Sequence, residues 1–385
     1  MTLKKVIIIG GDHHNTLAAI RCFGNSGIHV ITLIHSNEKN LGKIKCSKSK
    51  FARGNCNLVD EQEDSIMNWL LAHETGEKEF VFPCSDLAAY TLDKNRDTLK
   101  KRYNIPGFQD TNVSVRSLMN KWNQFTLANE LGVRTPMTWK YIFGEYLPNG
   151  IVFPCILKPV VSAVGLKSDI VKVNTDAELD TAISELKKKG YTEILIQEYV
   201  NYTMQYLACG CVLPKSDLQC GTIFEKQRES KNGSTGLGVV TSDLEVASQN
   251  EKIIRFLQEH KYWGCYDIEF FRSGEEVVLN EINLRHSGAG CLLIDNGVPI
   301  PFYWYQDGQK VINPEKTHLT PGTKFISEID DLYNVRIRNI SFFKWGYDCI
   351  HTTSHTIYNR SDLLGTLSFY NSFISIVTRR ALKRG

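Results

Sequence analysis

Two neighbouring segments with strand-like patterns constrain the fold more than any other feature of this sequence. Gly264–Phe271 and Glu276–Ile282 both predict strands, and the polar stretch Arg272–Glu275 between them predicts a tight turn. Side chains two residues apart on a strand share a face, so pairing of the two segments brings Glu269 beside Glu281. The sequence therefore predicts a hairpin that carries carboxylates on one face.

A metal site is the function that this polar face indicates. Glu281, Asn283 and Arg285 project together from the second strand. Magnesium requires hard oxygen ligands and binds through one or two carboxylates plus substrate phosphates, and an arginine alongside complements phosphate charge. The alternative is a strand whose solvent face happens to carry charges, but that gives no reason for an asparagine between a glutamate and an arginine.

The start of the chain predicts an α/β unit. Val6–Ile9 is a short apolar run that ends in glycine, as a buried strand does. Asn15–Gly27 predicts a helix and His29–Ile34 a second strand, which together form a β-α-β unit. Phe80–Pro83 predicts another strand, and Leu87–Lys101 a helix with apolar residues at helical spacing. An α/β sandwich follows from this order.

A second unit follows it. Asn112–Leu131 predicts a helix that ends at glycine and proline. Phe153–Val200 then predicts strand, loop, strand, helix and strand in that order. The glycine-rich stretch Lys231–Gly238 predicts a loop, and Ser248–His260 predicts a helix. The pattern after Lys316 leaves the role of the C-terminal region open.

Length, charge and cysteine usage bound the class of protein. At 385 residues the chain is too long for one compact core, so we expect two or three domains with a cleft between them. The net charge is +3, and lysine and arginine are scattered among aspartate and glutamate, which argues against a nucleic-acid partner. The eleven cysteines stand at irregular spacings, which predicts reduced, buried thiols.

Neither end of the chain predicts a transmembrane segment. The apolar run Val6–Ile9 is too short for a signal peptide or a membrane span, so we expect a cytoplasmic protein. Leu364–Leu382 mixes aromatic and aliphatic residues with Arg379 and Arg380. We favour a C-terminal helix packed on the core over a helix on a membrane surface, because nothing else in the chain asks for a membrane.

The hairpin motif resembles a family signature. The pattern from Glu281 to Arg285, with Glu269 twelve residues before Glu281, is similar to the metal-binding signature of the ATP-grasp superfamily. The resemblance implies an α/β (α+β) fold in which an N-terminal Rossmann-like pre-ATP-grasp domain precedes a two-subdomain ATP-grasp fold. The implied divisions are residues 1–110, residues 111–315 with a small lid-like subdomain at about 135–200, and a C-terminal region at 316–385.

Two lysines and a hinge extend the resemblance. In that family, a lysine near the start of the ATP-binding unit and a second lysine before a flexible loop reach the nucleotide phosphates, and Lys121 and Lys158 stand at matching places. Lys158 closes an apolar strand, where an ammonium is costly unless it finds anionic partners. Lys121 alone would pass for a lysine on a helix surface. The family hinge that binds adenine through backbone groups is matched by Gln197, Glu198, Tyr199 and Val200.

Two positions depart from the family pattern. The loop Val160–Lys167 should fold over the phosphates with its backbone N–H groups, but Gly165 is its only glycine, where many members carry several. Gln205 stands where the family often places a carboxylate for the ribose hydroxyls, and an amide accepts such hydrogen bonds less strongly. Both residues stay in the predicted nucleotide site.

Candidate substrate residues lie elsewhere. Arg228 precedes the glycine-rich stretch and is placed to meet the substrate carboxylate or the transferred phosphoryl, with an ordinary surface arginine equally compatible. Gly11 and Asp86 lie at the carboxyl edge of the predicted N-terminal sheet, where α/β folds bind ligands. His286 and Ser287 belong to a small polar loop that would admit a carboxylate. A Rossmann dinucleotide site is disfavoured, because the first glycines lack the later ones of G-x-G-x-x-G.

Within the superfamily the chain is similar to the carboxylate-amine ligases. Pro83–Asp86 and the glycines before Asp12 resemble D-aspartate ligase and the large chain of carbamoyl-phosphate synthase. The resemblance implies that ATP and two Mg²⁺ ions bind, and that a small-molecule carboxylate, activated as an acyl phosphate, passes to a small-molecule amine. The implied metal ligands are Glu269, Glu281 and Asn283, and the residues that steady the phosphoryl group are Lys158 and Arg285.

Two other functions are compatible with the fold that the resemblance implies. A nucleotide-binding sensor without ligase turnover would have no reason to keep Glu269, Glu281 and Lys158. Carboxylation through carboxyphosphate is disfavoured, because the sequence contains no biotin-carrier segment. The identity of the acid and of the amine stays open, as does the oligomeric state, a homodimer included.

Overall fold

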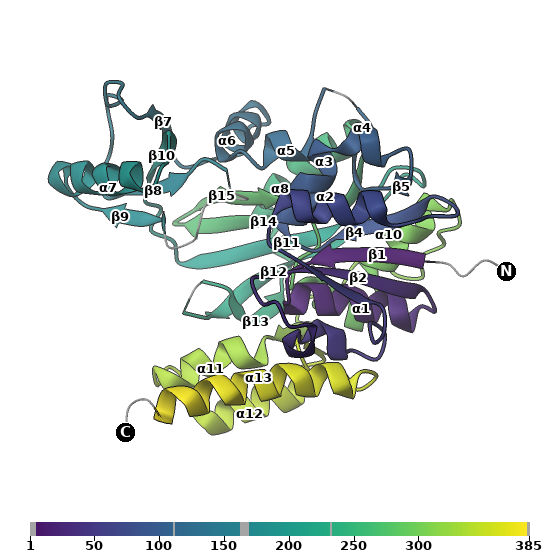
Figure 1. Cartoon of the computed structure of the whole chain (residues 1–385). Helices are drawn as coiled ribbons and strands as arrows, with labels where there is room; N and C mark the ends of the chain where they lie inside the picture. The colour runs from purple at the N-terminus through teal and green to yellow at the C-terminus, as the bar shows by residue number, and fades with distance from the viewer. Residues whose placement is uncertain (1–4, 111, 162–168, 232, 383–385) are drawn as a thin grey trace.

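The structure, a computed structural model, describes residues 5–110, 112–161, 169–231 and 233–382. These residues form three sheets with helices packed around them (Figure 1). A parallel sheet contains the start of the chain, a small antiparallel sheet forms a lobe that projects from the body, and a large sheet runs through the middle. The C-terminal helices lie along the lower side of the body in this view.

The N-terminal sheet confirms the predicted α/β unit. Its strands are parallel in the order β3-β2-β1-β4-β5. The central strand is apolar on both faces, since Ile7, Ile8 and Ile9 are fully buried between helices. The elements are β1 (Lys5–Gly10), α1 (His14–Asn25), β2 (His29–His35), β3 (Cys56–Val59), α2 (Glu63–Ala72), β4 (Glu79–Pro83), α3 (Asp86–Lys94), α4 (Arg96–Leu99) and β5 (Tyr103–Asn104).

The helix predicted over Leu87–Lys101 is interrupted at Asn95. This residue leaves helical geometry, with φ −103° and ψ 20°. Its side-chain amide donates hydrogen bonds to the carbonyl of Thr91 and to the carboxylate of Glu63. Asparagine side chains compete in this way with the backbone bonds of a helix, so α3 ends and the short α4 begins.

The lobe is an antiparallel sheet in the order β7-β10-β8-β9, covered on one face by α7. Leu179 and Leu186 of α7 pack with Leu157 and Ile196 of the sheet, and all four are buried. The strands and helix predicted within residues 153–200 are confirmed, whereas β7 was not predicted. The elements are β7 (Thr138–Ile142), β8 (Cys155–Pro159), β9 (Val171–Val173), α7 (Asp176–Lys188) and β10 (Glu193–Glu198).

The large sheet has the order β15-β14-β11-β12-β13-β16-β17, and β6 pairs with β14. Strand β13 occupies much of the stretch Lys231–Gly238, so the prediction of a loop there was wrong. A Cβ at Gly238 would lie 2.2 Å from Cε1 of Phe325 on the next strand, so this glycine serves close strand packing. The strands are β6 (Gly107–Phe108), β11 (Met204–Leu213), β12 (Leu218–Glu229), β13 (Thr235–Val240), β14 (Tyr262–Ser273), β15 (Glu276–Asn283), β16 (Lys324–Ile326) and β17 (Ser354–His355).

The helix predicted over Asn112–Leu131 is divided in two. The side chain of Asn120 accepts hydrogen bonds from the backbone N–H groups of Trp122 and Asn123, which caps a new helix start. Lys121 is consequently the first residue of that second helix. The helices beside the large sheet are α5 (Val115–Leu118), α6 (Lys121–Glu130), α8 (Leu244–Glu259), α9 (Gly290–Asp295) and α10 (Ile300–Gly308).

The C-terminal region adds two strands to the large sheet and three helices beside it. The last helix packs on the body, as predicted, because Phe369 belongs to the main core and is 6% exposed. Its other face exposes Leu364 and Leu367. Within the described ranges, no helix is long and apolar enough to cross a membrane. The helices are α11 (Glu328–Arg336), α12 (Phe342–His351) and α13 (Leu363–Leu382).

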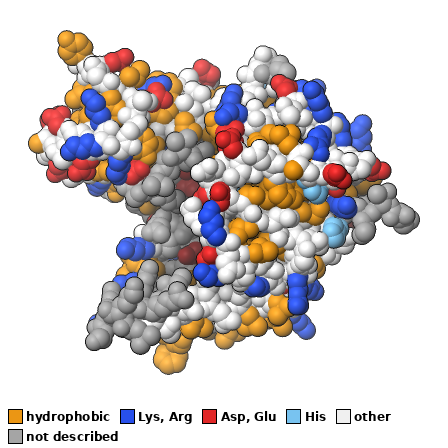
Figure 2. Space-filling view, in the orientation of Figure 1, with side chains coloured by type: hydrophobic (Ala, Val, Ile, Leu, Met, Phe, Trp, Pro, Cys, Tyr) orange, Lys and Arg blue, Asp and Glu red, His pale blue; other side chains and the backbone are white. Residues whose placement is uncertain are grey.

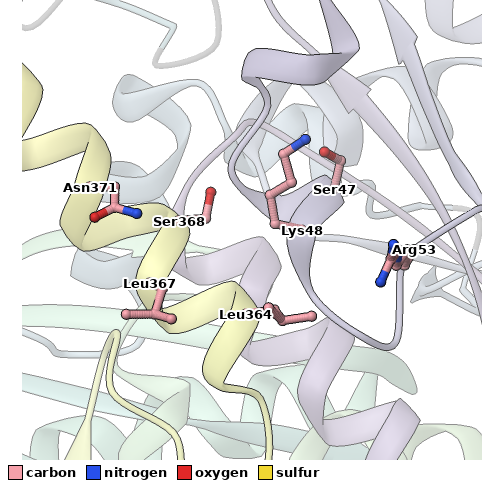
Figure 3. A pocket seen from close by; sticks show the side chains of 7 residues that line it. All are labelled: Ser47, Lys48, Arg53, Leu364, Leu367, Ser368 and Asn371. Atoms are coloured by element: carbon pink, nitrogen blue, oxygen red, sulfur yellow. The ribbon is translucent and has the colours of Figure 1, made fainter.

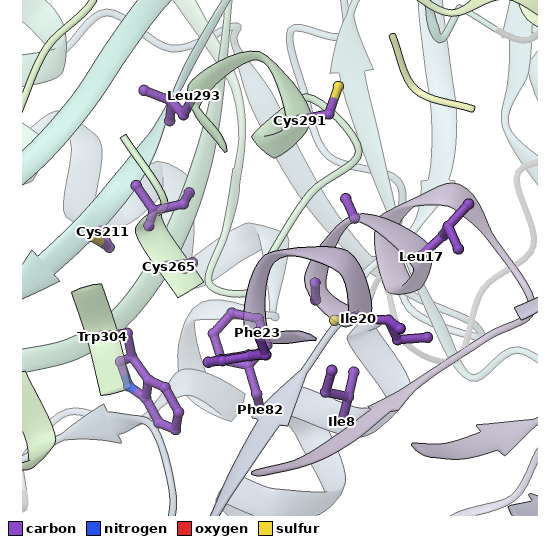
Figure 4. Packing of buried hydrophobic residues seen from close by; sticks show 14 of the residues in the cluster. Ile8, Leu17, Ile20, Phe23, Phe82, Cys211, Cys265, Cys291, Leu293 and Trp304 are labelled. Carbon is purple, nitrogen blue, oxygen red and sulfur yellow. The ribbon is translucent and has the colours of Figure 1, made fainter. Parts of the chain in front are cut away.

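One apolar core joins the N-terminal sheet to the large sheet (Figure 4). The ring of Phe23 on α1 meets that of Phe82 on β4 edge to face, with centroids 5.4 Å apart. Phe82 also lies 5.1 Å from Trp304 of α10. Cys265 and Cys291 belong to the same cluster, and all eleven cysteines carry free thiols, most of them buried. The predicted buried thiols are thus confirmed.

Candidate functional site

A cavity of about 590 Å³ lies where the lobe, the large sheet, the β1–α1 loop and the C-terminal region meet. In Figure 2 the molecule is hollowed between the lobe and the body. Side chains of both charges line this cavity, as a site for a charged, polyfunctional ligand requires. The charged residues are Lys121, Lys158, Lys226, Arg285, Asp267, Glu269, Glu281 and Asp330.

The β14–β15 hairpin confirms the predicted register. Glu269 stands opposite Glu281, and Asp267 stands opposite Asn283. Glu269 and Glu281 both line the cavity. The alternation of side chains across two paired strands therefore brings the two carboxylates together, as the sequence pattern predicted.

A β-bulge adds one polar residue that strict alternation places on the opposite face. The register shifts between Glu269 and Phe270, so Asn280 also faces the cavity. Its amide donates a 3.0 Å hydrogen bond to Glu269 Oε2, which also accepts a 2.7 Å bond from Gln205. Two amides therefore orient one carboxylate, and Gln205 acts through Glu269 as well as lining the cavity itself.

Lys158 is the most desolvated cation of the cavity. It is 4% exposed, and its Nζ donates a 2.7 Å hydrogen bond to Gln197 Oε1. Its ammonium also lies 4.9 Å from the centre of the Phe125 ring. Burial first, and then the neighbouring Lys121, lower the pKa of Lys158 well below its usual value. The site is therefore short of negative charge around this ammonium.

Lys121 connects the first turn of α6 to the hairpin. Its Nζ lies 2.6 Å from Glu281 Oε1, and both side chains are mostly shielded from solvent. The backbone N–H of Lys121 donates to the carbonyl of Val160, just past the end of β8. Lys121 therefore lies where the lobe meets the body.

Arg285 and Asp267 are two further charged residues of the cavity lining. Nε of Arg285 donates a 2.9 Å hydrogen bond to Asp86. Burial would lower the pKa of Arg285, but Asp86, Asp267 and Glu281 outweigh it and raise this pKa. Burial raises the pKa of Asp267 to about 6, against the opposing effect of Arg285. Asp86 is thus placed as a partner of Arg285 and lies outside the lining itself.

Several predicted site residues lie elsewhere. The guanidinium of Arg228 is bound by two buried carboxylates, Asp331 at 2.6 Å and Asp348 at 2.8 Å. It therefore links β12 to the C-terminal helices and does not line the cavity, which does not support a contact with the substrate. His286 is 1% exposed against Phe82, in the core, which does not support a direct substrate contact.

The remaining predicted residues divide in the same way. Ser287 lines the cavity, whereas Gly11 and Asn283 do not. The hinge residues also lie outside the lining, and Gln197 is instead the side-chain partner of Lys158. Gly165 lies outside the described residues. The other hinge positions are Glu198, Tyr199 and Val200.

The sequence patterns missed the cavity residues that come from the β1–α1 loop and from the C-terminal region. His13, His14 and Asn15 reach the cavity from the β1–α1 loop. Their position at the carboxyl edge of the N-terminal sheet was a usable signal, since ligands of α/β folds bind there. No local pattern marks Lys226 or Asp330. The C-terminal residues of the lining are Phe325, Ser327, Asp330 and Thr356.

The donor set fits a metal ion that arrives with phosphates. Across the described residues, no group of three histidine, cysteine, aspartate or glutamate side chains is arranged to hold a metal ion alone. Glu269 and Glu281 supply carboxylate oxygens on one side of the cavity. Mg²⁺ usually takes one or two carboxylates and completes its shell with waters and substrate phosphates. Two facing glutamates therefore suit it.

Comparisons with known proteins agree with this architecture. No family model matches the chain. A formate-dependent phosphoribosylglycinamide formyltransferase of Maridesulfovibrio salexigens is 23% identical over 228 residues, which are 57% of this chain and 56% of the relative. The same enzyme of Prochlorococcus marinus (strain MIT 9515) is 21% identical over 287 residues, 68% of this chain and 71% of the relative. The chain thus matches little more than half of the first relative.

Solved structures match more of the chain. N5-carboxyaminoimidazole ribonucleotide synthetase from Thermus thermophilus superposes with a TM-score of 0.61 at 17% identity, over 83% of this chain and 81% of that one. L-amino acid ligase from Bacillus licheniformis gives 0.58 at 16%, over 82% and 76%. Biotin carboxylase from Campylobacter jejuni gives 0.63 at 13%, over 83% and 74%. The chain has the ATP-grasp fold.

The lobe and the large sheet both contribute to the lining of this cavity, and the surface has other hollows. One of these, about 560 Å³, lies between α13 and the segment 47–53 (Figure 3). Its charged residues are Lys48 and Arg53, and the rest of its lining is Ser47, Leu364, Leu367, Ser368 and Asn371. It lacks the facing carboxylates of the main cavity.

Proposed function

We propose that this protein is an ATP-dependent ligase that joins a small-molecule carboxylate to an amine through an acyl phosphate and releases ADP and phosphate. One observation carries the proposal: Lys158 and Lys121 share a cavity with the facing carboxylates Glu269 and Glu281. The buried ammonium of Lys158 has a neutral amide as its hydrogen-bond acceptor. A polyphosphate would give it the charged acceptor that offsets its desolvation.

The same residues support roles in binding Mg-ATP. Lys158 and Lys121 would contact the phosphates, and Glu269 and Glu281 would hold Mg²⁺ together with phosphate oxygens. When bound, the metal neutralises phosphate charge and so assists displacement at the γ-phosphorus. Glu281 accepts a 2.6 Å bond from Lys121, so we expect this pair to rearrange as the nucleotide enters. Gln205, close to Glu269, is proposed to meet the ribose.

The adenine is proposed to lie along the hinge between the lobe and the large sheet. Gln197 and Glu198 end β10, and Tyr199 and Val200 begin the connection to β11 of the large sheet. Glu198 and Tyr199 each use their backbone N–H within the protein, toward Met137 and Pro154 respectively. The backbone contacts with adenine would therefore come from other groups of this segment.

Arg285 is proposed to hold the acid during transfer. Asp86 fixes it through Nε, and the side chain lines the cavity beside Ser287. A guanidinium at this place can bind the substrate carboxylate and the charge that develops on the phosphoryl group. The carboxylate oxygen then bonds to the γ-phosphorus while the bond to ADP breaks, and the amine displaces phosphate from the acyl carbon. No protein nucleophile is needed.

The names of similar proteins support the same class of reaction. Among them are a formate-dependent formyltransferase and an L-amino acid ligase, which point to a small acid and an amine as the substrates. Biotin carboxylase among the similar structures keeps bicarbonate within the range of acids to be tested. A nucleotide sensor has no specific observation in its favour, whereas two facing carboxylates and two lysines in one cavity support turnover of ATP.

A hydroxamate screen tests the proposal. The purified protein is given Mg-ATP, pools of small carboxylates and hydroxylamine, and ADP, phosphate and hydroxamates are measured by mass spectrometry. We expect one acid to stimulate release of ADP and to appear as its hydroxamate, and Arg285→Ala to suppress that product. Release of AMP and pyrophosphate, or ATP binding without any acid-dependent turnover, would contradict the proposal. Stimulation by bicarbonate alone would identify a carboxylating enzyme instead.

A further inference from the structure

The cavity is also lined by polar residues that belong neither to the lobe nor to the hairpin. Among them are His13 from the β1–α1 loop and Asp330 on α11, which are more than three hundred positions apart in the sequence. Arg285 lines the same cavity, and its charge is one of the groups that lower the pKa of His13. Neither His13 nor Asp330 has a role in the phosphoryl transfer proposed above.

Asp330 presents a carboxylate to the cavity. Its Oδ2 accepts a 2.8 Å hydrogen bond from the hydroxyl of Ser327. Among the described residues, no lysine or arginine nitrogen lies within ion-pair distance of it, whereas its neighbour Asp331 is bound by Arg228. Asp330 is half-buried and lines the cavity, so a cation that enters would find an oriented carboxylate.

The wall behind Asp330 is rigid. Ser327 is 2% exposed, and its backbone N–H donates to the carbonyl of Gly236 on β13. Thr356 donates to Ser327 at 3.2 Å and to Glu328 at 3.1 Å. Glu328 also accepts hydrogen bonds from the backbone N–H groups of Ile357 and Tyr358. Asp330 is therefore held by a network that does not depend on a ligand.

His13 faces the same space in its neutral form. Its Nδ1 lies 2.9 Å from Asn15 Oδ1 and 3.5 Å from the backbone nitrogen of Asn15. The shorter contact assigns the proton to Nδ1, so that Nδ1–H donates to Asn15 Oδ1 and the lone pair of Nε2 is left to meet a ligand. Crowding by protein atoms lowers the pKa of His13, and Lys45 and Arg285 lower it further, against Asp330, which raises it. A neutral imidazole that has a carboxylate near it can accept a proton, because the carboxylate stabilises the imidazolium.

These groups match the chemistry of an amine substrate. An alkylamine enters as an ammonium cation and must lose a proton before it can attack. A carboxylate near its entry site attracts the cation, whereas the negative acid is favoured at Arg285. We propose that Asp330 binds the ammonium group of the amine substrate and that His13 accepts its proton, which makes a positively charged primary amine the second substrate of the ligase. This inference rests on the proposed function.

The proton and electron balance is complete with these groups. The ammonium loses one proton to the His13 imidazole, and the positive charge stays beside Asp330. The nitrogen lone pair forms a bond to the acyl carbon, and the carbon–oxygen bond to phosphate breaks. The phosphate leaves with that electron pair and takes up the second nitrogen proton. The products are an amide, phosphate and a protonated His13, which returns its proton to water.

The test compares two nucleophiles on the full chain with the acid found in the hydroxamate screen. Hydroxylamine is uncharged at neutral pH, whereas methylamine, ethanolamine and the common amino acids carry an ammonium group. Asp330→Asn should raise the KM for the accepted amine about ten- to a hundredfold, because a charge-assisted bond is lost. Its effect on hydroxylamine should be at least tenfold smaller. Asp97→Asn, which is 92% exposed and remote, is the matched control.

His13→Gln should lower kcat with the accepted amine about a hundredfold, the usual contribution of a general base. In the wild-type protein this rate should fall as the pH drops through the pKa of His13. The titratable and charged groups around the His13 ring are Asp330, Lys45, Arg285 and His14. The variant should lose this dependence.

Equal effects of the two substitutions on both nucleophiles, or no effect on either, would overturn the amine site. So would a wild-type protein that forms the hydroxamate but accepts none of the amines. A wild-type protein that forms no hydroxamate with any acid contradicts the proposed function itself, so the two failures are distinguishable. Circular dichroism of each variant confirms that a loss of rate is not a loss of fold.

Discussion

Two parts of the cavity lining are held in different ways. One wall is the lobe, which carries Lys158, and the other is the C-terminal wall, formed by Phe325, Ser327, Asp330 and Thr356. The lobe that carries Lys158 has an apolar core of its own, which α7 and its sheet bury between them. It contacts the body through a small cluster of Phe125, Val160 and Leu195. The C-terminal wall that carries Asp330 shares the main core of the body through Phe325 and Phe369. One wall is thus a separable unit, and the other is continuous with the core.

Buried ion pairs add to this difference. Arg228 binds Asp331 and Asp348, and Arg21 of α1 binds Asp362 at 3.0 Å, all with side chains at most 9% exposed. The ion pair Lys140–Glu193 of the lobe is one-third exposed on both sides. Breaking a buried pair leaves an uncompensated charge, whereas an exposed pair contributes little. Lys158, the proposed phosphate contact, is therefore carried by a unit free to adjust, and Asp330, the proposed amine contact, by a fixed one.

The largest effect is expected at the hairpin between the two walls. Glu281→Gln should reduce turnover about a thousandfold or more, roughly 4 kcal/mol in activation free energy, because it removes one charge from the proposed metal site. Steady-state ADP release measures it, and circular dichroism checks that the variant stays folded. Glu276→Gln at the start of the same strand, with a side chain 63% exposed, is the control. Near-normal turnover in Glu281→Gln would remove the metal assignment.

The next effect tests how the C-terminal wall is held. Arg228→Leu should lower the free energy of unfolding by about 3 kcal/mol, because Asp331 and Asp348 lose their counter-charge inside the protein. Lys140→Leu in the lobe should change it by less than about 1 kcal/mol. Urea unfolding followed by tryptophan fluorescence measures both variants. Equal losses from the two substitutions would show that the walls do not differ in this way.

Local patterns were sufficient where the site lies on neighbouring strands. The alternation around Glu269 and Glu281 predicted their pairing, because a hairpin fixes register within a few residues. The same rule could not find Asn280, which a bulge turns into the cavity. Lys158 was marked by its position at the end of an apolar strand, and the structure places it in the cavity.

Long-range packing accounts for what the patterns missed. Arg228 and Asp331 are 103 positions apart, and no local period predicts that a guanidinium will turn to the C-terminal helices. Asp330 and Asp331 are adjacent in sequence, yet one lines the cavity and the other is fully buried. The glycines of the stretch Lys231–Gly238 led to the wrong prediction of a loop, because in the structure they permit close packing of a strand. Most strands and helices of the parallel sheet and of the lobe were predictable, because periodicity specifies single elements. It does not specify which distant side chains meet.

Substitutions of Lys158 in the lobe and Lys121 on α6 test the proposed phosphate contacts. Lys158→Ala should weaken Mg-ATP binding about a hundredfold and Lys121→Ala about tenfold, because Lys158 is the more desolvated and Lys121 already has Glu281 as a partner. Isothermal titration calorimetry measures both affinities. Lys187→Ala, in the last turn of α7 on the exposed face of the lobe, should change nothing. Equal and negligible effects at 158 and 121 would remove the phosphate contacts.

The smallest expected effect is a difference between the lobe and the body in how their stability depends on pH. The lobe, residues 135–200, contains no histidine, whereas the body buries His35 and His286 as neutral rings. Burial lowers the pKa of His35 to about 4 and that of His286 to about 3. The unfolded chain then binds more protons than the folded one, so their stabilisation is full above pH 6.5 and is lost as the pH falls toward 4 and 3. Each should lose about 1 kcal/mol between pH 6.5 and 5.5.

Hydrogen exchange, corrected for the intrinsic rate at each pH, should therefore show weaker protection in β1, β4 and β14 at pH 5.5 and unchanged protection in β8 and β10. His355 works in the opposite direction, because the carboxylate of Glu328 outweighs burial and raises its pKa, so its contribution grows as the pH falls. His286→Gln should remove about 1 kcal/mol of the pH dependence of the body. Parallel loss of protection in the lobe and in the body would mean that the two form one cooperative unit, and the distinction between a separable wall and a fixed one would then fail.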